Sequence, residues 1–357
     1  METEIAITGE CVLSSAGETA FALCENIVLG KKITQQIDLQ MYEKEIASLN
    51  TGPRELYRIQ KLLLTAFLKA SHAAGLKMGL PSPERTGIFL GNSYGIEEFK
   101  TEFFRLYKKS GPALTSSTLF PFTNANSLAS WLAIQIDAKG PNLTFVGGST
   151  SSAEAILAAC DALVADECDM AFVGGVSIID NNLSDEFYAS GFGYESAGML
   201  VLEKMKNATL ANRRPIAILK DQQRTIFTQE QIEKIMHKKS VSGVNDEAPG
   251  CFHQDIPEIV YLGNNLGDNV FSYNKNKSEI TKEQDKFFFL SDVIGNVFDA
   301  AGVLGVALSA DLFNLPKNTK WCPFGRTQES ILYSNIGSNG SAVKMLVESP
   351  AFTRKRK

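Results

Sequence analysis

The chain has 357 residues, of which 44% are hydrophobic and 21% charged, the composition of a globular protein long enough for two core units. Its net charge of −5 argues against nucleic acid as a main partner, and no apolar run is long enough for a membrane span. The six cysteines are scattered without a CxxC motif, so we expect a reduced, cytoplasmic protein with no metal site.

Predicted strands and helices alternate along the chain. Short apolar runs with β-branched members predict strands at residues 4–8 (ending at Gly9), 86–91, 143–146, 170–175, 199–203, 216–220, 257–262 and 287–290. Helical spacing of apolar residues predicts helices at 18–29, 54–75, 97–109, 127–136, 153–165, 229–239 and 299–313, and residues 331–334 and 342–347 predict a hairpin. Strands alternate with helices in a similar way in both halves of the chain, which predicts an α/β fold with buried sheets.

Residues 140–163 organise the rest of the chain. Residues 143–146 have the pattern of a short buried strand, Gly147 and Gly148 permit a sharp turn, and an alanine-rich helix follows. The hydroxyls of residues 149–152 can cap that helix. Ser149 would lie at the helix N-terminus, where the helix dipole favours an activated nucleophile. Taken by itself, the same stretch favours an ordinary capped strand–helix turn.

Several motifs, in order along nearly the whole chain, resemble those of the β-ketoacyl synthase family. They are an arginine-containing helix (58–76), RTGIFLGNSYG (85–95), a helix leading into Gly-Pro (120–141), AFVGG (171–175), GFGYESAGMLVLE (191–203) and a closing glycine-rich hairpin (334–347). The resemblance implies a thiolase-like, five-layer αβαβα fold built from two similar halves. We place these halves at residues 1–208 and 209–357.

The family's chemistry uses a cysteine, which accepts the acyl chain as a thioester, and two histidines that stabilise the developing negative charge. By resemblance, the cysteine position is Ser149, the first histidine position is Leu262 in YLGNNLGD, and the second is Asn296 in GNVFDAAG. The three histidines that the chain has, His72, His237 and His253, lie outside these motifs. We therefore expect no catalytic residues, and we predict that this chain alone does not condense acyl groups.

Within the family, the chain resembles a chain length factor, the ketosynthase-like partner of an active ketosynthase. Such a subunit pairs through the strand at 143–146, here with Leu143 and Phe145 at the interface, and lines the end of the partner's acyl tunnel. The tunnel residues implied here are Phe120, Phe122, Thr123 and Asn126. The implied partners are an active ketosynthase and an acyl carrier protein, whose acyl-phosphopantetheine goes to the ketosynthase. This chain would need no cofactor of its own.

Three alternatives stay open from the sequence. Ser149 could be the nucleophile of a serine-dependent acyltransferase or hydrolase, although none of the three histidines is an evident base for it. The chain could instead be a structural or regulatory binding protein with a closed pocket. Phe120 and Phe122 could be simple core residues rather than tunnel residues.

Overall fold

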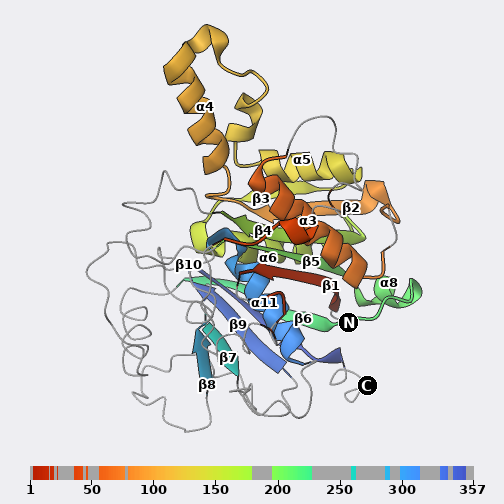
Figure 1. Cartoon of the computed structure of the whole chain (residues 1–357). Helices are drawn as coiled ribbons and strands as arrows, with labels where there is room; N and C mark the ends of the chain where they lie inside the picture. Colours follow the sequence, from red (N-terminus) through yellow and green to blue (C-terminus); the bar gives the residue numbers. More distant parts are fainter. Residues whose placement is uncertain are drawn as a thin grey trace.

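A computed structural model describes residues 3–15, 17–19, 22, 36–42, 46, 56–76, 79–178, 195–226, 259–262, 286–289, 298–313, 330–336 and 341–350. Its strands form one curled, ten-stranded sheet in the order β3-β2-β4-β5-β1-β6-β10-β9-β7-β8 (Figure 1). Pairing of β2 with β3 and β4 is parallel, and the other pairs are antiparallel. The predicted α/β class is therefore confirmed.

The strands are β1 (Ile5–Ser14), β2 (Thr86–Gly91), β3 (Asn142–Phe145), β4 (Met170–Ser177), β5 (Ser196–Lys204), β6 (Ala217–Ile226), β7 (Ile259–Leu262), β8 (Lys286–Phe289), β9 (Ser330–Ile336) and β10 (Ser341–Glu348). The α-helices are α3 (Arg58–Ala73), α4 (Glu97–Ser110), α5 (Ser127–Ile136), α6 (Ser151–Val164), α8 (Met205–Leu210) and α11 (Ala301–Leu312). Short 3₁₀ turns include η3 (Pro112–Leu114), η4 (Phe120–Thr123), η5 (Gly148–Thr150) and η6 (Phe298–Ala300). Within these residues, no helix has both the length and the apolar character needed to cross a membrane.

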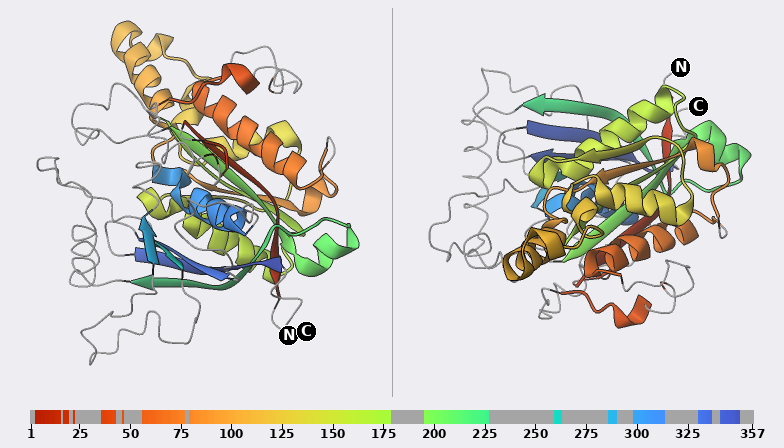
Figure 2. Two further views of the ribbon diagram at one scale, coloured as in Figure 1. Left: turned by 60° about the horizontal axis from the view of Figure 1, so that its bottom comes forward. Right: turned by 90° about the horizontal axis from the view of Figure 1, so that it is seen from above.

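Helices α6 and α11 form a middle layer between the two halves of the sheet (Figure 2). Helix α3 covers the outer face of the first half, which contains β1 to β5, and buries Leu62, Leu63 and Phe67 against it. Four layers are thus described, namely an outer helical layer, half a sheet, the helix pair and the other half of the sheet. These are four of the five layers of the predicted thiolase-like αβαβα arrangement.

The two halves of the sheet meet at a short junction between β1 and β6. Only three residue pairs join these strands, from Ile5↔Leu219 to Ile7↔Ala217. Strands β1 to β5 lie on one side of this junction and β6 to β10 on the other. The boundary at residues 208/209 stays a prediction, and it falls within α8.

Tight backbone packing holds the middle layer together. A Cβ added to Gly302 of α11 would lie 2.3 Å from the backbone nitrogen of Ala153 in α6, so only glycine fits there. The Ser152 hydroxyl accepts hydrogen bonds from the backbone N–H groups of Gly302 (3.0 Å) and Val303 (3.3 Å). The start of α11 is therefore fixed against the start of α6.

Most described elements begin and end within five residues of their predicted bounds, although β6 continues six residues past its predicted end, to Ile226. The main exception is β1, which does not end at Gly9 but continues to Ser14 through an irregularity between Ile7 and Gly9. Gly9 allows α3 to pack closely against β1, because a Cβ added at Gly9 would lie 2.2 Å from the carbonyl oxygen of Ala70 in α3. The helices predicted at 18–29 and 229–239 lie outside the described residues, apart from isolated positions of the first.

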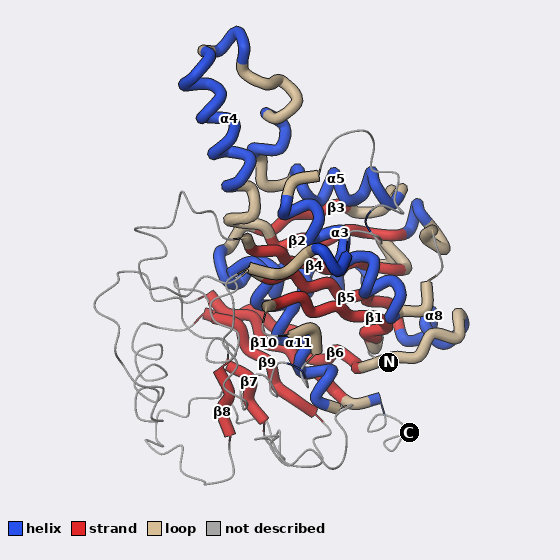
Figure 3. The backbone as a smooth tube through the Cα atoms, in the orientation of Figure 1, coloured by secondary structure: helices blue, strands red, loops and turns tan. Residues whose placement is uncertain are grey.

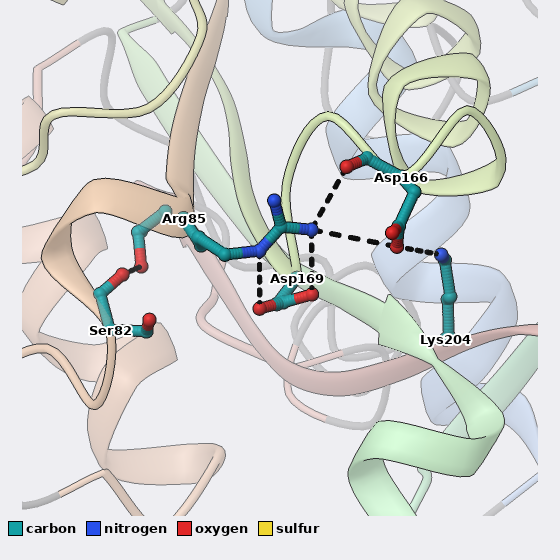
Figure 4. A network of polar contacts seen from close by, with 6 residues as sticks. Ser82, Arg85, Asp166, Asp169 and Lys204 are labelled. Atoms are coloured by element: carbon teal, nitrogen blue, oxygen red, sulfur yellow. Dashed lines mark hydrogen bonds and ion pairs between the residues drawn. The ribbon is translucent and has the colours of Figure 1, made fainter.

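A polar network at the surface joins three elements of the first half (Figure 4). Arg85, just before β2, donates to both carboxylate oxygens of Asp169 (2.7 and 3.0 Å) and to the Asp166 carbonyl (2.9 Å). Lys204, at the end of β5, donates to the Asp166 carboxylate (2.6 Å). Because these side chains are solvent-exposed, the network orders the loop between α6 and β4 more than it stabilises the fold.

A second ion pair, between Arg58 and Glu195, is partly buried. Arg58 donates through Nε and Nη2 to the two oxygens of Glu195, both at 2.6 Å, and Nη2 also donates to the Ile37 carbonyl (2.6 Å). The Ile37 N–H donates to the same carboxylate (2.9 Å), which is fully buried. Removal of the arginine would leave a buried carboxylate without its counter-ion.

We predict that Arg58→Ala lowers the free energy of unfolding by about 3 to 5 kcal/mol, because it strands the Glu195 charge in the interior. The matched control is Arg105→Ala, which removes another two-point arginine–carboxylate pair, to Glu102 on α4, at the surface. Its effect should be much smaller. Chemical denaturation followed by circular dichroism measures both, and equal losses would contradict the prediction.

Candidate functional site

The chain turns sharply from β3 into α6 around Ser149. Gly148 adopts a left-handed conformation (φ 62°) and opens the 3₁₀ turn η5, which leads directly into α6. Ser149 is the middle residue of η5 and is only 6% exposed. The predicted strand, turn and helix are confirmed, and Ser149 lies at the entrance to the helix as expected.

The hydroxyls around this turn bind the turn itself rather than capping the helix. The Ser93 hydroxyl oxygen accepts hydrogen bonds from the N–H groups of Gly147 (3.1 Å) and Gly148 (2.9 Å) and pairs with the Ser151 hydroxyl (2.8 Å). The Ser151 hydroxyl lies 2.6 Å from the Gly148 carbonyl, to which it can donate. At the N-cap, Thr150, no side chain forms a cap hydrogen bond. The predicted capping role of residues 149–152 is therefore wrong, because close backbone groups of the turn compete for these hydroxyls.

A buried carboxyl group, Asp299, lies behind the same turn. Its Oδ2 accepts a hydrogen bond from the Tyr94 N–H (2.7 Å), and the side chain is fully buried. Burial raises the pKa of Asp299 to about 6, although the hydrogen bond from the Tyr94 N–H and the nearby Ser93 and Ser151 hydroxyls partly offset this shift by favouring the charged form.

Asp299 was not predicted as a site residue from the sequence. The signal that could have identified it is its place within a family motif. It is the one charged residue in GNVFDAAG, the motif that holds the second histidine position.

The other predicted catalytic positions are only partly described. Leu262 is the last residue of β7, in the second half of the sheet, which agrees with its predicted place at a strand end. Asn296, His237 and His253 lie outside the described residues, and His72 is exposed in the last turn of α3. No group of three metal-binding side chains is found in the part of the chain that the structure describes. Cys160 is buried in α6, where burial raises the pKa of its thiol, so it is a core residue.

Strand β3 is an edge strand, and the prediction that residues 143–146 are buried is wrong for the single chain. Leu143 is 42% exposed and Val146 65%, while Phe145 packs partly on the central core. The physical reason is topological, because β3 pairs with β2 on one side and with no described strand on the other.

The predicted tunnel residues lie at the base of a projecting arm, defined here as residues 97–123 (Figures 1 and 3). Phe120 is 56% exposed, so it is not a core residue. Phe122 is half-buried, stacks on Phe99 with ring centroids 5.1 Å apart, and lines a cavity of about 1180 Å³. Thr123 is half-buried, and Asn126, just before α5, is exposed. The arm also exposes Phe104, Tyr107 and Leu114.

Residues 49–193 match the family model described as β-ketoacyl synthase, N-terminal domain. The chain is 26% identical over 294 residues to the pikromycin polyketide synthase component PikAIII of Streptomyces venezuelae, covering 71% of this chain and 18% of that protein. It is 28% identical over 194 residues to polyketide synthase ThaG of Burkholderia thailandensis, covering 46% of this chain and 3% of that protein. The chain thus spans less than a fifth of the length of either relative.

Solved structures share the fold at low sequence identity. One is a type II polyketide synthase acyl carrier protein in complex with its ketosynthase bound to the hexaketide (AntDE:AntF). It has a TM-score of 0.67, 13% identity and coverage of 98% of this chain and 100% of that chain. Another is the ishigamide ketosynthase/chain length factor, with a TM-score of 0.64, 16% identity and coverage of 97% and 99%. These likenesses confirm the predicted thiolase-like fold.

We predict that Asp299→Asn removes a pH-dependent loss of stability. The folded chain holds the proton of Asp299 more tightly than the unfolded chain, whose pKa lies near the ordinary 3.8. The associated stability is present below that value and is lost as pH rises through about 6. Relative to Asp299→Asn, the unsubstituted chain should therefore lose on the order of 3 kcal/mol over this range. Denaturant titrations across the range test this, and a pH-independent difference would refute it.

Proposed function

The chain is a member of the β-ketoacyl synthase family, and we propose that it is a non-catalytic, chain length factor-like subunit. In this proposal it pairs with an active β-ketoacyl synthase and shapes the acyl tunnel during fatty acid or polyketide-type chain elongation, including polyene products. The observation that carries the proposal is Ser149, a buried serine at the turn where the family places its cysteine.

The chemistry of the three positions supports this proposal. A serine hydroxyl is a poor nucleophile at neutral pH unless a base adjoins it. Leu262 can neither transfer a proton nor donate a hydrogen bond from its side chain, and Asn296 can donate a hydrogen bond but cannot act as a base. Without a thiolate and two histidines, the chain lacks the groups that decarboxylation and condensation require.

The exposed edge of β3 supports pairing. Strands at the end of a parallel segment are normally covered on both faces, and an open edge with apolar side chains favours association. Leu143 and Val146 present such an edge, and Ile134 of the neighbouring α5 is also largely exposed. A partner that adds its own strand to β3 would cover these side chains. The ketosynthase/chain length factor pair among the similar folds is consistent with such a partner.

In this proposal, the ketosynthase partner, and not this chain, carries the acyl chain. A cytoplasmic acyl carrier protein would deliver the chain on its phosphopantetheine to the ketosynthase cysteine, and this chain would contribute only wall residues. Phe120 is suited to that role because it is exposed rather than buried in the core. Phe122 is suited to it because it is only partly buried, where it stacks on Phe99 and lines the cavity. No cofactor is required of this chain.

We predict a one-to-one complex when this chain is co-expressed with an active ketosynthase from the same source. After loading with acyl carrier protein, intact mass should show acylation on the partner's cysteine only, and Ser149→Ala should leave product formation unchanged. Size-exclusion chromatography and mass spectrometry measure these outcomes. A homodimer acylated on Ser149 would instead establish the serine-dependent acyltransferase, and failure to pair with a ketosynthase would favour a separate binding protein.

The proposed interface is tested by one variant and its matched control. Leu143→Asp places a charge on the edge of β3 and should abolish the complex, because the charge would be buried there. Leu210→Asp makes the same change on α8, where the leucine is 77% exposed and lies away from β3, and should leave the complex intact.

We predict that the side-chain volume at Phe122 sets product length. Phe122→Ala should lengthen the products and Phe122→Trp should shorten them, because the residue would close the end of the tunnel. Liquid chromatography with mass spectrometry of the products measures the shift. Phe104→Ala, farther out on the arm, serves as the control and should leave product length unchanged. Identical product lengths in all variants would count against the tunnel role.

A further inference from the structure

Asp299 is held rigidly against the turn that contains Ser149. The backbone of Asp299 packs tightly against β4, because a Cβ added to Gly175 of that strand would lie 2.3 Å from the Asp299 carbonyl oxygen. Its carboxylate accepts from the Tyr94 N–H (2.7 Å), and η6 packs against η5. The carboxyl group therefore cannot rotate away from the turn without local rearrangement.

The hydrogen bonds of the turn lead to this carboxyl group. The N–H groups of Gly147 and Gly148 donate to the Ser93 oxygen, and Ser93 and Ser151 share a hydrogen bond of 2.8 Å. Both hydroxyls favour the charged form of Asp299. The residues immediately before Ser149, and Ser151 two residues after it, are thus connected to one buried carboxylate.

No neighbouring cation balances this charge among the described residues. The titratable side chains on the elements packed against Asp299 are Tyr94 before α4, Glu154, Cys160 and Asp161 on α6, Glu203 and Lys204 on β5, and Asp311 on α11. Burial is the largest cause of the shift in the pKa of Asp299, followed by hydrogen bonding. Glu154, Glu203 and Lys204 are paired with Arg224, Arg213 and Asp166 respectively.

We propose that Asp299 is a positioning residue that fixes the turn through the Ser93–Tyr94 segment, whose Tyr94 N–H donates to it, and places beside position 149 a negative charge that no described cation pairs, so that this turn opposes an anionic nucleophile. A thiolate at that position would be a second buried anion in the same site, which like-charge repulsion disfavours. Replacement of Ser149 by cysteine is then insufficient to restore a reactive thiol. The inference rests on the proposed function only in taking Ser149 as the position of the family's cysteine.

The test introduces a thiol and measures its ionisation. The pH dependence of iodoacetamide alkylation at position 149, assigned by peptide mass spectrometry, is recorded for Ser149→Cys and for Ser149→Cys with Asp299→Asn. The apparent thiol pKa should fall by about one unit or more in the double variant, a tenfold gain in thiolate at low pH. An unchanged or higher thiol pKa would overturn the proposal.

Two further variants distinguish the electrostatic effect of Asp299 on the thiol from the positioning of the turn by hydrogen bonds. Glu154→Gln in the Ser149→Cys background removes one negative charge from α6, the helix that follows position 149. A shift in the thiol pKa as large as that caused by Asp299→Asn would overturn the proposal. Ser93→Ala removes the acceptor of the turn N–H groups. It should change the limiting alkylation rate at high pH several-fold, whereas Asp299→Asn, which retains an acceptor, should change that rate little. An unchanged limiting rate in Ser93→Ala would overturn the positioning role.

The assay uses the full chain without partner or carrier protein, so its result is independent of whether the chain pairs with a ketosynthase. Circular dichroism establishes that each variant is folded. If Asp299→Asn does not fold, the thiol pKa of Ser149→Cys alone still decides the electrostatic part. It should lie above the ordinary value of about 8.5, and a lower value would overturn the proposal.

Discussion

The close approach of α6 and α11 is the constraint on which the rest of the structure depends. Gly302 lets the two helix backbones meet, and the Ser152 hydroxyl ties the first N–H groups of α11 to α6. Because both helices begin at this contact, the turns that precede them, η5 with Ser149 and η6 with Asp299, also meet there. The candidate site is thus a direct consequence of how the middle layer packs.

At this site a strand, a sharp turn and a helix enclose a buried serine. The Ser149 hydroxyl is buried, and the turn N–H groups are engaged by Ser93. A carboxyl group lies nearby, and no cation among the described residues forms an ion pair with it. Burial of such a group reduces stability at neutral pH, and the hydrogen bonds from the surrounding N–H and hydroxyl groups recover part of that loss. These features fit a turn that is kept for its shape.

The edge of the sheet at β3 is a second notable feature of the described structure. Strand β3 belongs to the parallel part of the sheet, yet no described strand pairs with its outer edge and it has exposed apolar side chains. The projecting arm exposes further aromatic residues. Both features are explained together if a second, similar chain packs against this side, and the incomplete site would then be compensated by the partner's complete one.

The sequence by itself determined the elements and much of their order. Apolar periodicity is a local property, so β2, α4, α5 and the strand–turn–helix around Ser149 could be read from it directly. Motif order was enough to predict the fold class. Only the tertiary structure decided which strand is at the edge, because burial depends on neighbours that are distant in sequence, as the exposed Leu143 and Val146 show. It likewise decided the continuation of β1 through Gly9, which depends on contact with α3, and the meeting of Ser93, Ser151 and Asp299, which come from three separate segments.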